Sequence, residues 1–287
     1  MDAVETSKRY LIYDNIVRGS GLGHFLASYN YGLQYSFKRG LEYLPVLGRI
    51  GHGFAPYRGL FESAIGLPDC TARREQIKSL DPDKYEIVEY DSYPNVKPGD
   101  FISTSDDYTT TRAYFQERYA NHRRLFPTHL KEGTYNICLS VRRGHIFDHE
   151  HLKNRIIPDS YFRKALSKYI PHSNDYHVHV FSDGDGESHY YIDQNRDRLN
   201  IEGMAALFGI DPEKTSYHTS FDSNHDRFDP NTVLSQFQSS IDADIFIGSS
   251  SGFSSIIALY RSDVSVFPAD GPINFAGIDN VEYIDYR

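Results

Sequence analysis

The sequence predicts an α/β protein built on a doubly wound parallel sheet. Short apolar, β-branched runs alternate along the chain with stretches whose apolar residues recur at helical spacing. Strands of a parallel sheet are buried on both faces, so they read as continuous apolar runs of this kind. Several of the runs end on a polar or glycine-rich loop, where open parallel sheets bind their ligands.

Composition is consistent with a globular protein of one large or two medium domains, since the 287 residues are 39% hydrophobic and 24% charged. A net charge of −9 argues against a broad nucleic-acid-binding surface, so we expect no nucleic-acid partner. The two cysteines, Cys70 and Cys138, show no metal-binding spacing. The N-terminus lacks the apolar core of a signal peptide, and no run is long enough to span a bilayer. We therefore expect a cytoplasmic protein.

The first half opens with a strand at 9–13, a glycine loop, a helix at 24–39 and a strand at 43–47. The helix carries an apolar residue every fourth position, which gives it one face toward the core. That stripe consists of Phe25, Tyr29, Leu33 and Phe37. Further elements are expected as short helices at 57–65 and 72–80, a strand at 85–90 and a helix at 105–125.

The glycine loop at 19–23, GSGLG, has two interpretations. A dinucleotide-binding fingerprint also places glycines between a strand and a helix. However, the spacing is not G-x-G-x-x-G, and no acidic residue ends the second strand to bind a ribose. The other interpretation is a flexible loop whose backbone, at Gly21 and Gly23, comes close to a ligand, with His24 at the start of the helix.

The second half restarts the strand–helix pattern after a linker at 126–133, so we place the two domains at 1–130 and 131–287. Proline at position 230, after Asp229, marks a helix start. The expected strands are 135–141, 176–181, 215–219, 244–248 and 264–267. The expected helices are 159–169, 201–208, one that starts at 229–230, and 253–261.

The stretch 243–260, ADIFIGSSSGFSSIIALY, reads as a strand, a polar loop and a helix. The loop is Ser249, Ser250, Ser251 and Gly252, and the helix follows from Phe253. Hydroxyls and free N–H groups at a helix N-terminus suit a phosphate. The same residues also suit an ordinary turn in which a serine caps the helix, and the stretch alone does not decide between the two.

Polar side chains follow three of these strands, at the edge of the sheet where ligands bind. They are Arg142 and Arg143, Ser182 and Asp183, and the run from Ser249 to Ser255. Two guanidinium groups and a helix start can hold a diphosphate, while a carboxylate can accept hydrogen bonds from a ribose or a base. For the arginines alone, a solvated strand end or an ion pair with Asp148 or Glu150 is the alternative.

Four short motifs resemble the α1,2-, α1,6- and protein O-fucosyltransferase group. Val141-Arg142-Arg143-Gly144 resembles the H-x-R-R-G-D region of that group, and Phe181-Ser182-Asp183 resembles its F-S-D. Residues 247–255, IGSSSGFSS, resemble its strand–loop–helix with N/S-S-x-F-S, and Gly21-Leu22-Gly23-His24 resembles its G-L-G-N. The matches follow the order of the family and span most of the chain.

The resemblance implies a GT-B glycosyltransferase, with two Rossmann-like domains whose parallel sheets face a cleft. Residues 1–130 would form the acceptor side and residues 131–287 would bind the nucleotide-sugar donor. The family is inverting and usually needs no metal. Carried over, Arg142 and Arg143 neutralise the leaving diphosphate, and Asp183 contacts the nucleotide. The other implied donor-binding residues are Gly21, Gly23, Ser182, Ser249, Ser250, Ser251, Gly252, Phe253, Ser254 and Ser255.

Two positions depart from the family pattern. Ser140 stands where the family often has His, and His145 stands where it often has Asp. The resemblance therefore favours fucose from GDP-fucose but leaves xylose or another sugar from a UDP donor open. Because the chain shows no membrane anchor of the kind found in Golgi relatives, we expect a bacterial protein or a viral protein in the host cytoplasm.

Transfer to a hydroxyl of a glycan or glycoside acceptor needs a general base. His24 is the first candidate, because the helix start places it beside the glycine loop, and Asp14, His145 and Asp148 come next. His24 as a residue that only binds substrate is the alternative. Arg143 is the third residue expected to act in catalysis, through stabilisation of the leaving group.

No cofactor or metal is expected, although Asp183-Gly184-Asp185 offers a rival interpretation. Two carboxylates spaced in this way can share Mn²⁺ or Mg²⁺ on a donor diphosphate, whereas Asp and Gly also simply favour turns. The acidic loop from Asp222 to Asp229, with His225, also has the composition of a cation site, but a solvated loop is favoured. Two other functions stay open: a non-catalytic nucleotide- or carbohydrate-binding protein on the same scaffold, and a Rossmann oxidoreductase.

Overall fold

The computed structural model describes residues 9–14, 22–45, 65–79, 85–89, 108–122, 127–142, 156–171, 175–182, 190–191, 198–199, 201–219, 230–271, 275 and 278–287. The backbone divides into two compact units. One is Met1–Arg123 with Asn274–Gly277, and the other is Arg124–Ile273 with Ile278–Arg287. The domain boundaries predicted from the sequence, 1–130 and 131–287, stay a prediction.

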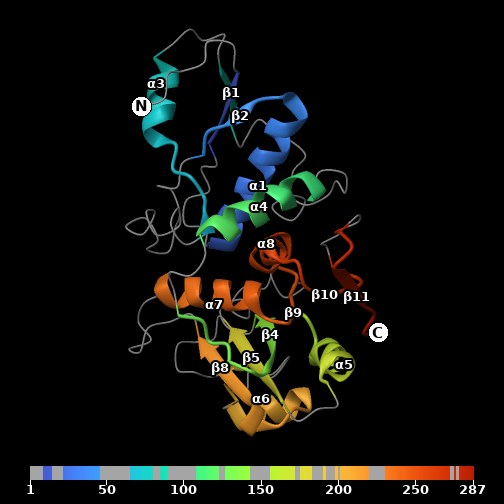
Figure 1. The fold of residues 1–287 in the computed structure, drawn as a ribbon. Helices are drawn as coiled ribbons and strands as arrows, with labels where there is room; N and C mark the ends of the chain where they lie inside the picture. The colour runs from blue at the N-terminus through green and yellow to red at the C-terminus, as the bar shows by residue number, and fades with distance from the viewer. Residues whose placement is uncertain are drawn as a thin grey trace. The chain divides into compact units, whose positions relative to one another are not determined.

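The first unit contains a three-stranded parallel sheet in the order β2-β1-β3 (Figure 1). Its described elements are β1 (Tyr10–Asp14), α1 (Leu22–Arg39), β2 (Glu42–Tyr43), α3 (Thr71–Lys78), β3 (Tyr85–Glu89) and α4 (Tyr108–His122). Strand β1 alternates its side chains between two apolar clusters, as the period of a strand requires. Tyr10 and Ile12 pack with Ile77 of α3, whereas Leu11 packs with aromatic side chains that include Tyr31 of α1.

The second unit contains a six-stranded sheet in which every strand is parallel to its neighbours, in the order β11-β10-β9-β4-β5-β8. The strands are β4 (Tyr135–Val141), β5 (Tyr176–Ser182), β8 (Thr215–Thr219), β9 (Ile245–Ile247), β10 (Ser265–Pro268) and β11 (Val281–Ile284). The helices are α5 (Asp159–Tyr169), α6 (Ile201–Phe208), η8 (Pro212–Lys214), α7 (Pro230–Asp242) and α8 (Gly252–Tyr260), and a separate small antiparallel pair consists of β6 (Tyr190–Tyr191) and β7 (Arg198–Leu199).

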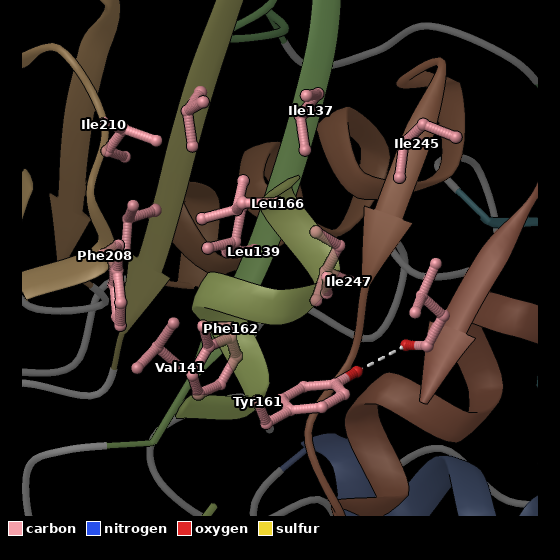
Figure 2. Close-up of a cluster of buried hydrophobic side chains, with 14 of the residues drawn as sticks. Ile137, Leu139, Val141, Tyr161, Phe162, Leu166, Phe208, Ile210, Ile245 and Ile247 are labelled. Carbon is pink, nitrogen blue, oxygen red and sulfur yellow. Dashed lines mark hydrogen bonds between the residues drawn. The ribbon is translucent and has the colours of Figure 1, made fainter. Parts of the chain in front are cut away.

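Helices cover both faces of this sheet (Figure 1). On one face, Ile137 and Leu139 of β4 join an apolar cluster with Phe162 of α5 and Phe208 of α6 (Figure 2). On the other face, Cys138 of β4 contacts α7, where its thiol donates to a backbone carbonyl. The prediction of an α/β protein with a doubly wound parallel sheet is therefore confirmed.

A buried arginine bonds the end of α7 to the residues that precede β9 and β10. Arg261 directly follows α8 and has no exposed surface. Its Nη1 donates to the carbonyls of Ser240 and Ile241 at the end of α7, at 2.6 and 2.8 Å. Its Nη2 donates to the carbonyls of Asp244 and Val264, at 3.3 and 3.2 Å, where the chain enters β9 and β10. One side chain thus satisfies the helix-end carbonyls that a helix leaves without partners.

Several predicted boundaries are wrong for local reasons. The second strand ends at Tyr43, and Pro45 follows, which has no N–H to continue a ladder. Helix α1 begins at Leu22, so Gly23 lies in its first turn and not in a loop. Strand β11 was not predicted, because it is short and lies at the edge of the described sheet, with Tyr283 40% exposed. Of the helix predicted at 57–65, only Ile65 lies within the described residues.

Candidate functional site

The strand order of the second unit places its reversal point between β4 and β9. From β4, the next strands along the chain, β5 and β8, add on one side, whereas β9, β10 and β11 add on the other. In open parallel sheets, ligands bind outside the carboxyl ends of the two strands where this reversal occurs. Leu139 pairs with Ile247 in the register, so Arg142 and Gly248 leave the sheet at the same edge. The polar loop after Gly248 therefore occupies the position where this fold class binds ligands.

The serine loop, residues 249–251, leads directly into α8. Ser251 is the N-cap of the helix, and its Oγ accepts a hydrogen bond from the N–H of Ser254 at 3.1 Å. Gly252 and Phe253 occupy the first two helical positions, and N–H groups at these positions have no carbonyl partner within a helix. The helix dipole adds partial positive charge there. The two interpretations of this loop are thus compatible, because a capped helix start still presents free N–H groups.

The hydroxyl groups of the loop are bonded to one another. Ser249 Oγ donates to Ser251 Oγ at 3.3 Å, and Ser251 Oγ donates to Ser254 Oγ at 3.0 Å. Ser254 Oγ then donates to Ser140 Oγ of β4 at 3.1 Å. This hydroxyl chain fixes the loop to the neighbouring strand. Ser140, which stands where the fucosyltransferases often have His, is therefore the residue of β4 to which the serine loop is bonded.

Two further hydroxyls at this edge are buried and unpaired. Among the described residues, Ser250 Oγ and Ser182 Oγ have no hydrogen-bond partner, although the two residues are 7% and 4% exposed. Ser182 ends β5 and pairs in register with Val141, so it lies at the same edge as Arg142. A Cβ atom on Gly271 would lie 2.8 Å from Ser250 Oγ, so only glycine leaves room beside this hydroxyl. Buried hydroxyls without partners call for a ligand or water to satisfy them.

Ser254 is the centre of the hydroxyl chain and gives a direct test of it. Replacing Ser254 with Ala removes the acceptor of the Ser249 N–H, at 3.2 Å, and of Ser251 Oγ. We expect the free energy of unfolding to fall by about 1–3 kcal/mol, because a buried N–H loses its partner. Thermal unfolding measures this, with the exposed Ser167→Ala on α5 as the control, for which we expect a change within about 0.5 kcal/mol. Equal unfolding temperatures for the two variants would contradict the network.

A tyrosine of α5 that the sequence did not indicate bonds to the carbonyl groups at the end of β9 and in β10. The Tyr161 hydroxyl of α5 lies 3.0 Å from the carbonyl oxygen of Gly248 and 2.9 Å from that of Val266, and donates to these acceptors. Figure 2 shows this hydroxyl beside the apolar cluster, with a hydrogen bond to a backbone carbonyl. Burial holds the pKa of Tyr161 well above its ordinary value, so the hydroxyl stays a donor. No local signal identifies this residue, because its partners lie 87 and 105 positions away.

Tyr161→Phe should leave the cluster packed but remove this hydrogen bond. We expect a loss of about 1–2 kcal/mol in the free energy of unfolding. Two buried carbonyls would lose the hydroxyl donor, but that of Val266 would still accept from the N–H of Gly248. Urea unfolding measures the loss, and Tyr176→Phe, a half-buried tyrosine of β5, serves as the matched control. An unchanged urea midpoint for Tyr161→Phe would show that the hydroxyl does not hold the strand ends.

The remaining predicted site residues lie partly within and partly outside the described part of the chain. Within it, Arg142 directly follows β4 and is half-buried. His24 lies in the first turn of α1 and Asp14 ends β1, so both belong to the first unit, and their catalytic roles stay predictions. Predicted residues outside the described part of the chain are Gly21, Arg143, His145, Asp148, Asp183, Asp185 and the 222–229 loop.

In the described part of the chain, no group of three or more His, Cys, Asp or Glu side chains could hold a metal ion. The rival metal site at Asp183 and Asp185 lies outside those residues and stays untested. Within the same residues, no helix combines the length and the apolar character needed to cross a bilayer.

No family model matches the chain, and no curated protein matches it. Among solved structures, it is similar to NodZ α-1,6-fucosyltransferase soaked with GDP-fucose, with a TM-score of 0.44 and 14% identity over 88% of this chain and 93% of that one. It is similar to TibC, an iron-containing dodecameric glycosyltransferase from enterotoxigenic E. coli, with a TM-score of 0.40 and 11% identity over 99% of this chain and 65% of that one. For POFUT1 in its apo form, the TM-score is 0.31 and the identity 14%, over 91% of this chain and 74% of that one.

One of these structures is an α-1,6-fucosyltransferase, so the resemblance of the sequence motifs to fucosyltransferases is confirmed as a likeness. The identities and TM-scores are too low to carry an argument about what this chain does.

Proposed function

We propose that the protein is a glycosyltransferase that moves a sugar from a nucleotide-sugar donor to a hydroxyl group of a glycan or glycoside. The observation that carries the proposal is the serine loop with the α8 N-terminus at the β4/β9 reversal point, beside Arg142. A diphosphate needs N–H donors, cationic side chains and a helix dipole at one place, and this edge supplies them. The motif resemblance to fucosyltransferases favours the same assignment.

The chemistry follows from where charge develops. The acceptor oxygen attacks the anomeric carbon, the bond from that carbon to the diphosphate oxygen breaks, and the nucleoside diphosphate leaves with the electron pair. The N–H groups of Gly252 and Phe253, with Arg142 and Arg143, stabilise the negative charge on the leaving group. A base takes the acceptor proton, and His24 or Asp14 is proposed for this role. Attack from the face opposite the leaving group inverts the anomeric centre.

Fucose from GDP-fucose is the proposed donor, with a UDP sugar such as UDP-xylose as the alternative. No metal is needed in this proposal, because the cationic side chains and the helix start carry the charge. The hydroxyl chain through Ser140 occupies the position where the family often has His. That substitution favours the second candidate function, a protein that binds the nucleotide sugar on the same scaffold without transferring it.

A ligand panel tests the proposal. Thermal unfolding is followed with GDP-fucose, GDP, UDP-xylose and UDP, and a ligand that binds the folded chain is expected to raise the unfolding temperature increasingly as its concentration exceeds its Kd. The same donor is then incubated with glycan acceptors, and release of the nucleoside diphosphate is measured. Turnover supports the transferase, whereas binding without turnover supports the second candidate. A chain that is stabilised by none of the four ligands would contradict both.

A further inference from the structure

Four histidines that the proposed function does not use gather in the second unit. His177 and His179 lie on β5, His218 lies on β8, and His129 comes from the segment 127–134, which leads into β4. The rings of His129 and His218 are 4.1 Å apart, those of His177 and His179 are 4.8 Å apart, and those of His179 and His218 are 5.6 Å apart. The ring of Phe181 packs against three of the four imidazoles.

We propose that this histidine cluster is a proton-sensitive latch, which holds segment 127–134 and strand β8 on β5 at neutral pH and releases them in acid. Both pieces are suited to release. Strand β8 lies at the edge of the described sheet and pairs with β5 alone. Segment 127–134 lies in the second unit and leads into β4, and His129 holds it there by ring contact and by its backbone N–H, which donates to Ser239 Oγ of α7 at 2.9 Å.

The hydrogen bonds fit a neutral form of the central pair, His179 and His218. Asn136 Nδ2 donates to the carbonyls of Lys131 and Thr134, so the amide orientation is fixed and Oδ1 is an acceptor. His179 Nε2 lies 2.9 Å from this oxygen and must carry a proton there, so in the neutral imidazole Nδ1 is the acceptor. His218 Nε2, 3.4 Å from that Nδ1, is then the donor. A second proton on His179, at Nδ1, would either set two N–H groups against each other across this contact or force His218 into the tautomer whose Nε2 carries no proton.

The described residues place no acidic side chain against the cluster that could compensate a positive charge. Among the described residues, the charged group that acts on the cluster is Lys131, which is itself cationic. The groups that face the cluster from β4 are Asn136 and the neutral thiol of Cys138, whose pKa is raised by burial. The groups from β8 and α7 are the hydroxyls of Ser216 and Ser239. In the described part of the chain, a proton added to the closed cluster thus has no carboxylate to stabilise it.

The pKa values follow this environment. Burial lowers the pKa of His177 to about 4 and those of His179 and His218 to about 3, with further lowering by neighbouring positive charge, and burial also lowers the pKa of His129. An open segment restores the ordinary value of roughly 6.5. The open state therefore binds more protons than the closed state between pH 6.5 and pH 4. The latch is fully stable above pH 6.5 and weakens as the pH falls below it.

Amide hydrogen exchange on the full chain at pH 7.5 and pH 5.5, corrected for intrinsic rates, tests the latch. Each imidazole released should raise the opening constant about tenfold over this interval. We expect this rise in residues 127–134 and 215–219, and a smaller one in the central strand, 245–247. Equal pH responses in all three segments would overturn the proposal.

A variant separates the latch from general acid sensitivity. His218→Phe keeps a ring against Phe181 and His129 but cannot take a proton, so the pH response of residues 127–134 should shrink by about tenfold. If that variant does not fold, His129→Phe offers the same comparison at the other side of the ring contact. An unchanged pH response in the folded variant would also count against the latch.

Discussion

Replacing Arg261 with Met should lower the free energy of unfolding by about 3–5 kcal/mol. The guanidinium is fully buried and donates to four backbone carbonyls, of which two close the end of α7. Methionine fills a similar volume but donates nothing, so these carbonyls would stay buried without partners. Since a domain of this size is stable by only about 5–15 kcal/mol, the loss would be a large part of the total.

Urea unfolding followed by circular dichroism measures the effect. Arg163→Met on the exposed face of α5 is the matched control, and we expect a change within about 0.5 kcal/mol. Burial lowers the pKa of Arg261 to about 10, so the side chain stays charged at neutral pH. Arg261→Lys keeps the charge but cannot reach four carbonyls, and it should fall between wild type and Met. A loss below about 1 kcal/mol for Arg261→Met would show that water replaces the arginine.

The second large effect concerns the helix start that the proposed function assigns to the diphosphate. Gly252→Pro removes one N–H group at the first helical position, where proline is tolerated. The N-cap residue Ser251 is extended, with φ −138° and ψ 149°, which suits a residue that precedes proline. The variant should therefore fold like wild type. A hydrogen bond to a charged group is worth about 1.5–3 kcal/mol, so nucleotide affinity should fall roughly 10- to 100-fold.

The parts of this fold that depend on neighbours in the sequence were predictable. The apolar runs identified β4, β5 and β9, and the serine–glycine turn after β9 identified the start of α8, because turn and capping chemistry act within a few residues. The polar edge was also predictable, since parallel strands end on the same side of a sheet. Ser182 and Arg142 do lie at that edge.

Contacts that depend on strand order were not predictable. Ser140 read as a departure from a family motif, yet its partner, Ser254, lies 114 positions away and becomes its neighbour only because β9 adds beside β4. The hydrogen bond of Tyr161 to Gly248 was not predictable for the same reason. Arg261 read as the end of an apolar helix, where an exposed cation is usual. The structure buries it instead, because the chain turns there into β10.

The histidine cluster was missed for a third reason. Alternation along YHVHVF identified β5 but did not say which face the imidazoles share, nor that His218 pairs opposite Phe181 in the register. Only the parallel pairing of β5 with β8 brings these residues together. His129, in an irregular segment, carried no signal in the sequence.

The proposed diphosphate site at the start of α8 is tested most directly by isothermal titration calorimetry of GDP and UDP with wild type, Gly252→Ala and Gly252→Pro. Gly252→Ala keeps the N–H and controls for the added side chain. We expect wild type and Gly252→Ala to bind one of the two nucleotides with affinities within about twofold, and Gly252→Pro to bind it at least about tenfold more weakly at an unchanged unfolding temperature. Binding by Gly252→Pro that equals Gly252→Ala, or no binding by wild type to either nucleotide, would contradict the proposed site.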